Sequence, residues 1–346
     1  MHVHHIDRLF DERLRDDPVR PGVHREVERH ARGESNGIIA GSTGRRNHVN
    51  PIAAGTLLRR QAADLRLDAA SPGGIAVGYV GDVHAWTVRH NAPVPQSLVF
   101  VHAHPDDEAL LTAGTMAKAV RAGHHVTLVI ATDGAAGLTS SAYRDGLADI
   151  RRAELLESAS RLGVHDVHWL GYGDSGLHGE NADGFASSDI GEVADRIATI
   201  ATGADILIGY DPAGGYGHPD HQRVHQAVRR AWLATPAQLF EATLPREIIR
   251  WSAHIAAAIH LAPTSFDPEE FDRAWTPSRE ITNRVNVRSV MDAKRAALRA
   301  HASQAHADGT IRTLGVLSRL PTPLLSLILG TEYYVSIPRS DATSMS

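Results

Sequence analysis

FVHAHPDDEALLTAG, residues 100–114, joins the end of an apolar run to a group of acids and then to a second apolar pattern. The run Leu98–Val101 has the length and composition of a buried strand, and Ala109–Ala122 has the apolar spacing of a helix. Between them lie one histidine and three acids: His104, Asp106, Asp107 and Glu108. Because unpaired charge is costly to remove from water, these acids form either a solvated helix start or a site that holds something positive.

The same alternation of patterns continues along the chain. Apolar runs of strand length are SLVFVHA (97–103), HVTLVIAT (125–132), DVHWLGY (166–172) and DILIGYD (205–211). Segments with helical spacing lie between them, at Ala109–Ala122, Leu147–Leu162 and Ile190–Ala201. This order predicts an α/β fold, a Rossmann-like and mostly parallel sheet with helices on both faces. Ligands of such sheets bind at the carboxyl ends of the strands, where the strand order reverses, so we expect the site in the loops after these runs.

Composition excludes several classes of protein. The chain has 346 residues, a formal net charge of -5 and no cysteine. The negative charge argues against nucleic acid or an anionic membrane as the main partner, and no run has the length of a membrane-spanning helix. Without cysteine, a metal must bind through histidine and carboxylate, and the composition fits a cytoplasmic protein, with a homo-oligomer left open. Residues 1–95 are expected to form a partly flexible N-terminal extension of unreadable role, before a domain over residues 96–340.

A second polar stretch, YDPAGGYGHPDHQRVHQAV (210–228), also follows a predicted strand and opens a predicted helix. Its chemistry-bearing side chains are His218, Asp220, His221 and His225. The pair Gly214-Gly215 permits a tight loop and a close approach of the backbone to a ligand. Two strand ends of one sheet therefore each carry a His-Pro-Asp triplet.

A divalent metal ion explains both stretches together. A catalytic zinc takes three ligands from histidine and carboxylate and leaves a fourth position for water. His104 and Asp107 can point into one crevice from a single strand-to-helix turn, and His221 is the natural third ligand. Asp106 then lies beside the ion, where it can take a proton from water.

His218 and Asp220 remain as a pair in which the carboxylate fixes the imidazole tautomer and favours its charged form. His225 lies one helical turn after His221 and is either a fourth ligand or a surface or supporting residue. Each motif alone also suits an ordinary helix start, with acids in the first turn and proline at its first position. Their joint occurrence at two strand ends favours the metal site.

The motifs AHPDDE (103–108) and GGYGHPDH (214–221) resemble the PIG-L/LmbE-like family of zinc-dependent N-acetylglucosaminyl deacetylases, in particular its mycothiol-pathway deacetylase and mycothiol-conjugate amidase branch. Weaker matches follow in the family's order: TDGAAG (132–137), RRAELLESASRLGV (151–164), LGYGDSGL (170–177) and KRAALRAHASQ (294–304). The resemblance covers about residues 96–335. It implies a hydrolase that removes an N-acetyl or related N-acyl group from a small amino-sugar substrate by metal-activated water. It implies Zn²⁺ as cofactor, with Fe²⁺ as the alternative metal.

The resemblance also implies residue roles. Three zinc ligands and a general base would be His104, Asp107, His221 and Asp106. Tyr216 would be a mobile tyrosine whose hydroxyl helps to bind the oxyanion. His218 would be a cationic partner that stabilises the oxyanion or protonates the leaving amine, and Asp220 would orient His218.

Two further residues, Arg151 and Asp174, would contact the sugar hydroxyls. Arg152 is the alternative to Arg151, and the DSG sequence around Asp174 is also simply a good turn. Three polar residues lie on a predicted C-terminal helix, where a solvated face is the simpler interpretation: Lys294, His301 and Gln304. The chain departs from the family pattern in its long extension and in Asn286, where the family has an aspartate. The polar loop 176–189 is expected to help set substrate identity.

Other classes of function share parts of this pattern. A mycothiol-conjugate-type amidase would use the same site on another amide. A facial-triad Fe(II) oxygenase has the same ligand types but needs no adjacent base such as Asp106. A non-catalytic carbohydrate-binding protein would not need the ligands and the base together. A Rossmann dehydrogenase is excluded, because GGIAVGYVG (73–81) does not offer G-x-G-x-x-G between a strand and a helix.

Overall fold

The computed structural model describes residues 25–26, 94–136, 146–258, 267–307, 310–311 and 313–344. The predicted extension, residues 1–95, lies almost wholly outside these residues, so the predicted boundary between extension and main domain stays a prediction. Within the described part, no helix has both the length and the apolar character that a membrane crossing requires.

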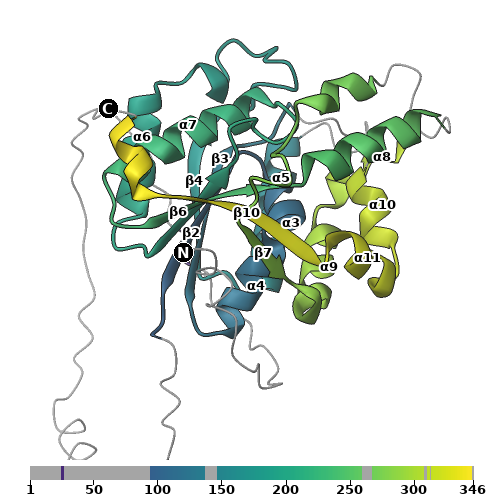
Figure 1. The fold of residues 1–346 in the computed structure, drawn as a ribbon, viewed down its shortest axis with the longest axis horizontal. Helices are drawn as coiled ribbons and strands as arrows, with labels where there is room; N and C mark the ends of the chain where they lie inside the picture. Colours follow the sequence, from purple (N-terminus) through teal and green to yellow (C-terminus); the bar gives the residue numbers. More distant parts are fainter. Residues whose placement is uncertain are drawn as a thin grey trace, which may run out of the picture. The chain divides into compact units, whose positions relative to one another are not determined.

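One sheet dominates the described residues (Figure 1). Its eight strands lie in the order β1-β4-β3-β2-β5-β6-β10-β7. They are β1 (Arg25–Glu26), β2 (Ser97–His102), β3 (His125–Thr132), β4 (Asp166–Tyr172), β5 (Ile206–Tyr210), β6 (Gln238–Thr243), β7 (Asn283–Asn286) and β10 (Thr331–Ile337). The pairs from β1 to β6 are parallel, whereas β10 is antiparallel to both β6 and β7. The predicted α/β fold with a mostly parallel sheet is confirmed, and it carries an antiparallel edge. A separate hairpin pairs β8 (His306–Ala307) with β9 (Thr310–Ile311).

The strand order places the two His-Pro-Asp motifs side by side. From β2 the chain continues outward through β3 and β4, and then returns to β5 on the other side of β2. β2 and β5 pair directly, with Phe100 opposite Ile208. The connections after these two strands therefore leave in opposite directions and open a crevice between them. His104 follows β2 and His218 follows β5, so both motifs border this crevice.

Helices cover both faces of the sheet (Figure 1). One face packs against α4 (Ala113–Arg121), α5 (Leu147–Leu162) and α9 (Met291–Ala300), and the other against α6 (Ile190–Ile200) and α7 (Pro219–Leu233). Along β2, Leu98 and Phe100 belong to the first core, and Val99 and Val101 to the second. Burying each of these side chains contributes about 1.5–3 kcal/mol. The strand that leads to His104 is thus fixed from both sides.

The predicted helix over 109–122 is divided in two. α3 (Asp107–Leu111) begins earlier than predicted, and Thr112 interrupts the helix with φ −135° before α4 starts. The predicted helices at 147–162 and 190–201 agree with α5 and α6 within one residue.

Three further helices, α8 (Arg246–Ala258), α10 (Thr313–Arg319) and α11 (Thr322–Leu329), form a group beside the sheet in Figure 1. Short 3-10 turns complete the described elements: η2 (Phe185–Ser187), η3 (Pro268–Asp272), η4 (Arg288–Val290), η5 (Ala302–Gln304) and η6 (Arg339–Ser344).

Candidate metal centre

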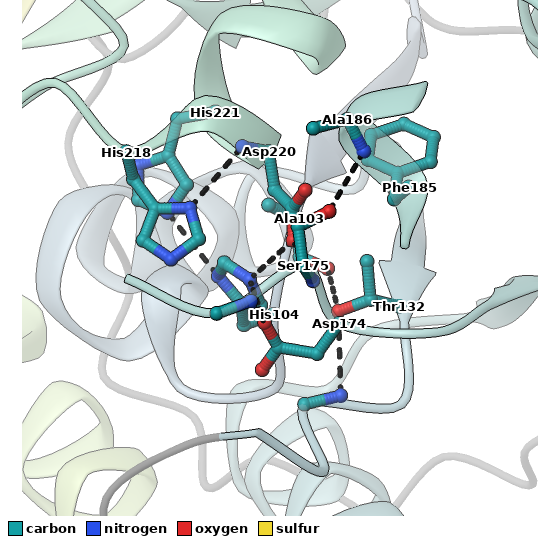
Figure 2. Close-up of polar contacts among 12 residues, drawn as sticks. Ala103, His104, Thr132, Asp174, Ser175, Phe185, Ala186, His218, Asp220 and His221 are labelled. Carbon is teal, nitrogen blue, oxygen red and sulfur yellow. Dashed lines mark hydrogen bonds and ion pairs between the residues drawn. The ribbon is translucent and has the colours of Figure 1, made fainter. Parts of the chain in front are cut away.

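Two helix starts bring the candidate ligands together. Asp107 is the first residue of α3, directly after the loop that follows β2. His218 is the N-cap of α7 and Pro219 its first residue, where a proline costs no backbone hydrogen bond. Figure 2 shows His104 between His218 and His221 of α7 on one side and Asp174 on the other. Residues more than 100 positions apart in the chain therefore share one buried cluster.

Three ligand atoms form a nearly equilateral triangle. His221 Nε2 lies 3.2 Å from His104 Nδ1 and 3.3 Å from Asp107 Oδ2. The third edge, from His104 Nδ1 to Asp107 Oδ2, is 3.4 Å. A tetrahedral zinc about 2.0–2.1 Å from each ligand atom separates those atoms by roughly 3.3–3.4 Å. The three predicted ligands thus have the spacing of one face of a zinc tetrahedron. His104, His218 and His221 also offer ligand atoms within 4.8 Å of one another.

The second nitrogen of His104 supports the same interpretation. Its Nε2 lies 3.1 Å from Asp220 Oδ2 and 3.5 Å from Asp174 Oδ1. A carboxylate can only accept, so in the neutral ring the proton stands on Nε2 and the lone pair of Nδ1 points into the triangle. A metal-bound histidine usually donates its other ring N–H to a carboxylate, as His104 can do here.

The cluster strongly attracts positive charge. Burial lowers the pKa of His104, but hydrogen bonds to Asp107, Asp174 and Asp220 outweigh burial and place its pKa well above the ordinary value. Burial raises the pKa of Asp107, and His221 and His104 hold it well below the ordinary range. A proton on His104 balances part of the negative charge of these carboxylates. A bound divalent ion would balance the same charge.

Asp106 stands at the N-cap of α3, but its carboxylate does not cap that helix. Its backbone has φ 126°, a conformation that favours glycine and costs about 1–3 kcal/mol in another residue. Its N–H donates to Glu108 Oε2 at 3.0 Å, and its Oδ1 lies 3.3 Å from Arg151 Nη2. Burial raises the pKa of Asp106, against the opposing charge of Arg151. The carboxylate is thereby a better proton acceptor than an exposed aspartate.

The two predicted sugar-binding residues are both near the triangle. Arg151 has a side chain only 3% exposed, and it donates to the carbonyl oxygens of Pro105, at 2.7 Å, and Gly134. Arg152 instead lies over the ring of Trp169, 5.3 Å from its centroid, so Arg151 is the arginine at the cavity. Asp174 has its pKa lowered to about 2, because hydrogen bonds to His104 and to a backbone N–H outweigh burial. Contact of either residue with a sugar stays a prediction.

The contacts of the Asp220 carboxylate are with Ser175 and His104, and the predicted roles of Asp220 and His218 stay predictions. The Asp220 carboxylate accepts from the backbone N–H of Ser175 at 3.0 Å and contacts His104, whereas only its backbone N–H reaches His218 Nδ1, at 3.2 Å. Burial, together with His104 and His221, lowers the pKa of His218 to about 4. His218 is therefore neutral near pH 7. Since its Nδ1 accepts from the backbone, the neutral ring carries its proton on Nε2.

Tyr210 supports two of the ligands and was missed in the sequence. Its hydroxyl donates to Asp107 Oδ2 at 2.6 Å and accepts from the backbone N–H of Ala103 at 3.0 Å. Its ring stacks on His221 with centroids 4.3 Å apart. The signal in the sequence is its position as the last residue of β5, directly before the second motif.

The glycine loop before His218 positions Tyr216 at the rim. Gly215 has φ 65°, and a Cβ there would lie 2.7 Å from the ring of Trp275. Asp211 Oδ1 accepts from Gly215 N at 3.0 Å, which fixes the loop from inside. Tyr216 is 42% exposed, with its ring centroid 5.3 Å from that of His221. The loop was predicted to let its backbone approach a ligand closely. In the structure the backbone at Gly215 also lies close to a protein side chain, that of Trp275. The predicted oxyanion role and mobility of Tyr216 stay predictions.

The predicted solvated face of the C-terminal helix is wrong, because its polar side chains are buried. His301 is 0% exposed, and its Nε2 lies 2.6 Å from Glu108 Oε1. Glu108 Oε1 also accepts from Ser158 Oγ at 2.6 Å. The same Glu108 accepts the backbone N–H of Asp106, so the pair of Glu108 and His301 supports the backbone of the predicted base.

A second buried ion pair lies behind the first. Lys294 Nζ is 2.5 Å from Glu332 Oε1, and both side chains are almost fully buried. Glu332 also accepts the backbone N–H groups of Gly114 and Thr115, each at 2.8 Å, at the start of α4. Gln304, the third of the predicted surface residues, is 2% exposed and lines the cavity described below.

Two remaining residues lie away from the triangle. His225 Nδ1 is 3.0 Å from the carbonyl oxygen of Tyr210 and 3.3 Å from Glu241, so it is not placed as a fourth ligand. Asn286 accepts from the backbone N–H of Arg288 at 3.1 Å, in a turn after β7.

A cavity of about 1040 Å³ opens above the triangle. The three candidate ligands, Asp106, Arg151, Asp174, His218 and Tyr216 all line it. It is also lined by Leu177, His178, Glu180 and Asn181, which belong to the loop expected to influence substrate identity. Every predicted site residue except Asp220 therefore lines one cavity.

Known proteins resemble this chain in sequence. A family model described as PIG-L: GlcNAc-PI de-N-acetylase matches residues 99–232. The 1D-myo-inositol 2-acetamido-2-deoxy-alpha-D-glucopyranoside deacetylase of Kineococcus radiotolerans is 34% identical over 272 residues, which cover 66% of this chain and 75% of that protein. The enzyme of the same name from Thermobifida fusca is 34% identical over 242 residues, covering 62% of this chain and 85% of that protein.

Among solved structures, the N,N'-diacetylchitobiose deacetylase from Pyrococcus horikoshii matches 70% of this chain and 84% of its own, with 22% identity and a TM-score of 0.47. The sequence relatives carry the assignment, because they are more than 30% identical over at least three quarters of their own length. The chain belongs to the PIG-L family of de-N-acetylases and is a deacetylase of the hydrolase class, as its two His-Pro-Asp motifs predict.

Proposed function

We propose that this protein hydrolyses the N-acetyl group of a small molecule that contains N-acetylglucosamine. The relatives from Kineococcus and Thermobifida are named for an acetamido sugar linked to inositol, which supports this sugar for the present chain. The observation that carries the proposal is the triangle of His104 Nδ1, Asp107 Oδ2 and His221 Nε2, with edges of 3.2–3.4 Å, at a cavity that Asp106 also lines.

The metal we propose is zinc. Two imidazoles and one carboxylate, with room for water, are a common catalytic zinc set, and Fe²⁺ is the alternative for the same ligand types. When bound, Zn²⁺ would polarise the amide carbonyl and lower the pKa of a coordinated water to about 7.

The contacts of the surrounding side chains support the following roles. Asp106 takes a proton from the attacking water, helped by the burial that raises its pKa. The neutral ring of His218 donates from Nε2, and the Tyr216 hydroxyl is the second donor, to the oxygen that gains negative charge. The carbon–nitrogen bond then breaks, the proton held by Asp106 passes to the amine, and acetate is the other product. One oxyanion donor typically contributes about 3–4 kcal/mol.

The neutral His218 differs from the cationic partner that the family resemblance implies. A neutral imidazole can still donate a hydrogen bond, but it cannot itself be the acid that protonates the amine. We therefore assign the protonation of the amine to Asp106. The cytoplasmic location and the homo-oligomer remain predictions from the sequence.

The test is acetate release by the zinc-loaded protein from N-acetylglucosamine and from its inositol glycoside. Asp106→Asn removes the proton acceptor and keeps the side-chain shape, so we expect a rate roughly 100- to 10,000-fold lower with unchanged zinc content. Asp149→Asn, at an exposed acid of α5, is the matched control and should leave both unchanged. Near wild-type turnover in Asp106→Asn would show that another group is the base.

A further inference from the structure

Trp275 has a backbone conformation that a large side chain disfavours. Its φ is 59°, and Asp106 is the only other residue apart from glycine that has a positive φ within the part of the chain that the structure describes. In this left-handed region the Cβ lies too close to the following carbonyl oxygen, so surrounding contacts must hold the residue there. Both residues line the same cavity. The contacts that hold Trp275 therefore lie at the wall of the candidate site.

Hydrogen bonds hold the backbone of Trp275 on both sides. Its N–H donates to the carbonyl oxygen of Gly215 at 2.7 Å. Its carbonyl oxygen accepts from the guanidinium of Arg246, the first residue of α8, at 2.6 Å to Nη2 and 3.1 Å to Nε. Hydrogen bonds from a charged donor are roughly twice as strong as neutral ones. Arg246 therefore fixes Trp275, and Trp275 in turn fixes Gly215.

The ring of Trp275 packs on Gly215 as well. A Cβ at position 215 would lie 2.7 Å from one ring carbon and 2.9 Å from a second, so the ring approaches the glycine backbone more closely than any other residue type would allow. Trp275 is only 7% exposed. Both the backbone and the ring of Trp275 therefore hold one residue of the glycine loop.

The neighbour of Trp275 holds a second residue of the same loop. Asp211 Oδ1 accepts the N–H of Gly215 at 3.0 Å, and Asp211 Oδ2 accepts from the hydroxyl of Thr276 at 3.1 Å. Tyr216 follows Gly215 directly and lines the cavity, with its ring centroid 6.5 Å from that of Trp275. The place of the Tyr216 backbone is therefore set by contacts with residues 275 and 276.

We propose that Trp275 is a positioning residue that holds Gly215 and thereby places the hydroxyl of Tyr216 where the oxyanion forms. The inference rests on the proposed deacetylation and on the donor role proposed for Tyr216, and it assigns to Trp275 an effect on the rate rather than on zinc or sugar binding. A donor stabilises the oxyanion fully only when it is held in place before the reaction, and a displacement of about 1 Å can cost roughly 100-fold in rate. Backbone strain is typical of residues whose contacts serve a site.

The first test replaces Trp275 by glycine, which adopts φ 59° without strain and keeps the backbone N–H while it removes the ring. We expect kcat for acetate release from N-acetylglucosamine to fall roughly 10- to 100-fold, with unchanged zinc content and with KM within about twofold of wild type. Trp275→Phe keeps an aromatic ring against Gly215 and should restore kcat to within about threefold of wild type.

Trp251→Ala is the control for the loss of an indole ring. Trp251 is 69% exposed and is not among the residues that line the cavity, so its replacement should change neither kcat nor KM. A loss in Trp275→Gly that appears in KM alone would show that the ring binds the sugar directly, and would overturn the positioning role.

A double-mutant cycle tests whether Trp275 acts through Tyr216. Tyr216→Phe removes the hydroxyl and should lower kcat about 100- to 1,000-fold, as the loss of other oxyanion donors does. In that background Trp275→Gly should lower kcat by less than about threefold more, because the hydroxyl that it would misplace is already gone. Two effects on kcat that simply multiply would refute the inference.

Hydrogen exchange gives a readout that does not depend on turnover. In the metal-free protein, the amides of residues 211–217 should exchange about tenfold faster in Trp275→Gly than in wild type, because the ring that packs on Gly215 is lost. Unchanged exchange, or wild-type kcat in this variant, would overturn the inference and leave the proposed function intact. If Trp275→Gly does not fold, as judged by thermal unfolding, Trp275→Leu takes its place in each comparison. Absence of acetate release by the wild type from every N-acetylglucosamine substrate would instead overturn the proposed function.

Discussion

Replacement of His301 by alanine should destabilise the protein through a charge that it leaves behind. Glu108 and His301 are both 0% exposed, with 2.6 Å between Glu108 Oε1 and His301 Nε2. The variant keeps two neutral donors to Glu108, Ser158 Oγ at 2.6 Å and the N–H of Asp106 at 3.0 Å, but removes the only cation that contacts this carboxylate directly among the described residues.

The magnitude follows from the cost of an unpaired buried charge. Removing one partner of a buried ion pair costs about 3–5 kcal/mol. A domain of this size loses about 2–4 °C of Tm per kcal/mol, so we expect His301→Ala to lower Tm by about 6–20 °C. Because the two neutral donors remain, values toward the lower end are expected.

The Tm difference between wild type and His301→Ala should depend on pH, which a loss of packing alone would not explain. Burial lowers the pKa of His301, but Glu108 raises it above the ordinary 6.5. The stabilisation that charged His301 gives the folded protein is therefore complete below about pH 6.5 and is lost as the pH rises through the raised pKa. Burial raises the pKa of Glu108, but His301 and Ser158 hold it below the ordinary 4.5, so its contribution is present above about 4.5 and is lost as pH falls through the lowered value. The Tm difference between wild type and His301→Ala should be largest between these limits and should narrow at alkaline pH.

The assay is thermal unfolding followed by circular dichroism at fixed zinc, from weakly acidic to alkaline pH. Glu108→Gln removes the charge, so His301→Ala should cost less by at least about 1 kcal/mol in that background. A cost of His301→Ala that is the same with Glu108 and with glutamine, and independent of pH, would refute the ion-pair argument and leave only a packing role for His301.

Three further variants, one of them with a matched control, test the other contacts. His221→Ala should bind no stoichiometric zinc by elemental analysis, whereas His225→Ala should keep it, and zinc retained by His221→Ala would exclude His221 as a ligand. Asp220→Asn should weaken zinc binding roughly 10- to 100-fold in a chelator competition, with activity restored by excess zinc; a loss that persists at saturating zinc would instead place Asp220 in the chemistry. Glu332→Ala should lower the free energy of unfolding in urea by about 3–5 kcal/mol, because it leaves buried Lys294 unpaired, and a change below about 1 kcal/mol would show that water replaces the carboxylate.

The sequence predicts the parallel part of the fold well, because its signals are local. Each central strand is an apolar run, and the helices on the sheet carry apolar residues at helical spacing, most clearly in Ile190–Ile200. The division at Thr112 and the antiparallel β10 are not local signals. β10 pairs with β6 and β7 across long stretches of chain, and such a choice of partner leaves no mark in the periodicity of either segment.

The candidate site shows the same contrast. The proximity of His104, Asp107 and His221 follows from two strand ends in one sheet, and that much could be predicted. The residues that the Asp220 carboxylate contacts could not be predicted, because these contacts depend on how α7 is rotated about its axis. The burial of His301 was also unpredictable, since a polar helix face that contacts a buried carboxylate has the same spacing as one that faces water.

The pair of Glu108 and His301 has a consequence for how the protein is assembled during synthesis. Every candidate ligand, from His104 to His221, leaves the ribosome well before His301 does. At that stage Glu108 lacks its partner His301, and the acid that holds the first turn of α4, Glu332, has not yet been made. A nascent chain that already holds all three candidate ligands therefore lacks the contacts that support its predicted base, and we expect metal loading to come late, after the last strand has joined the sheet.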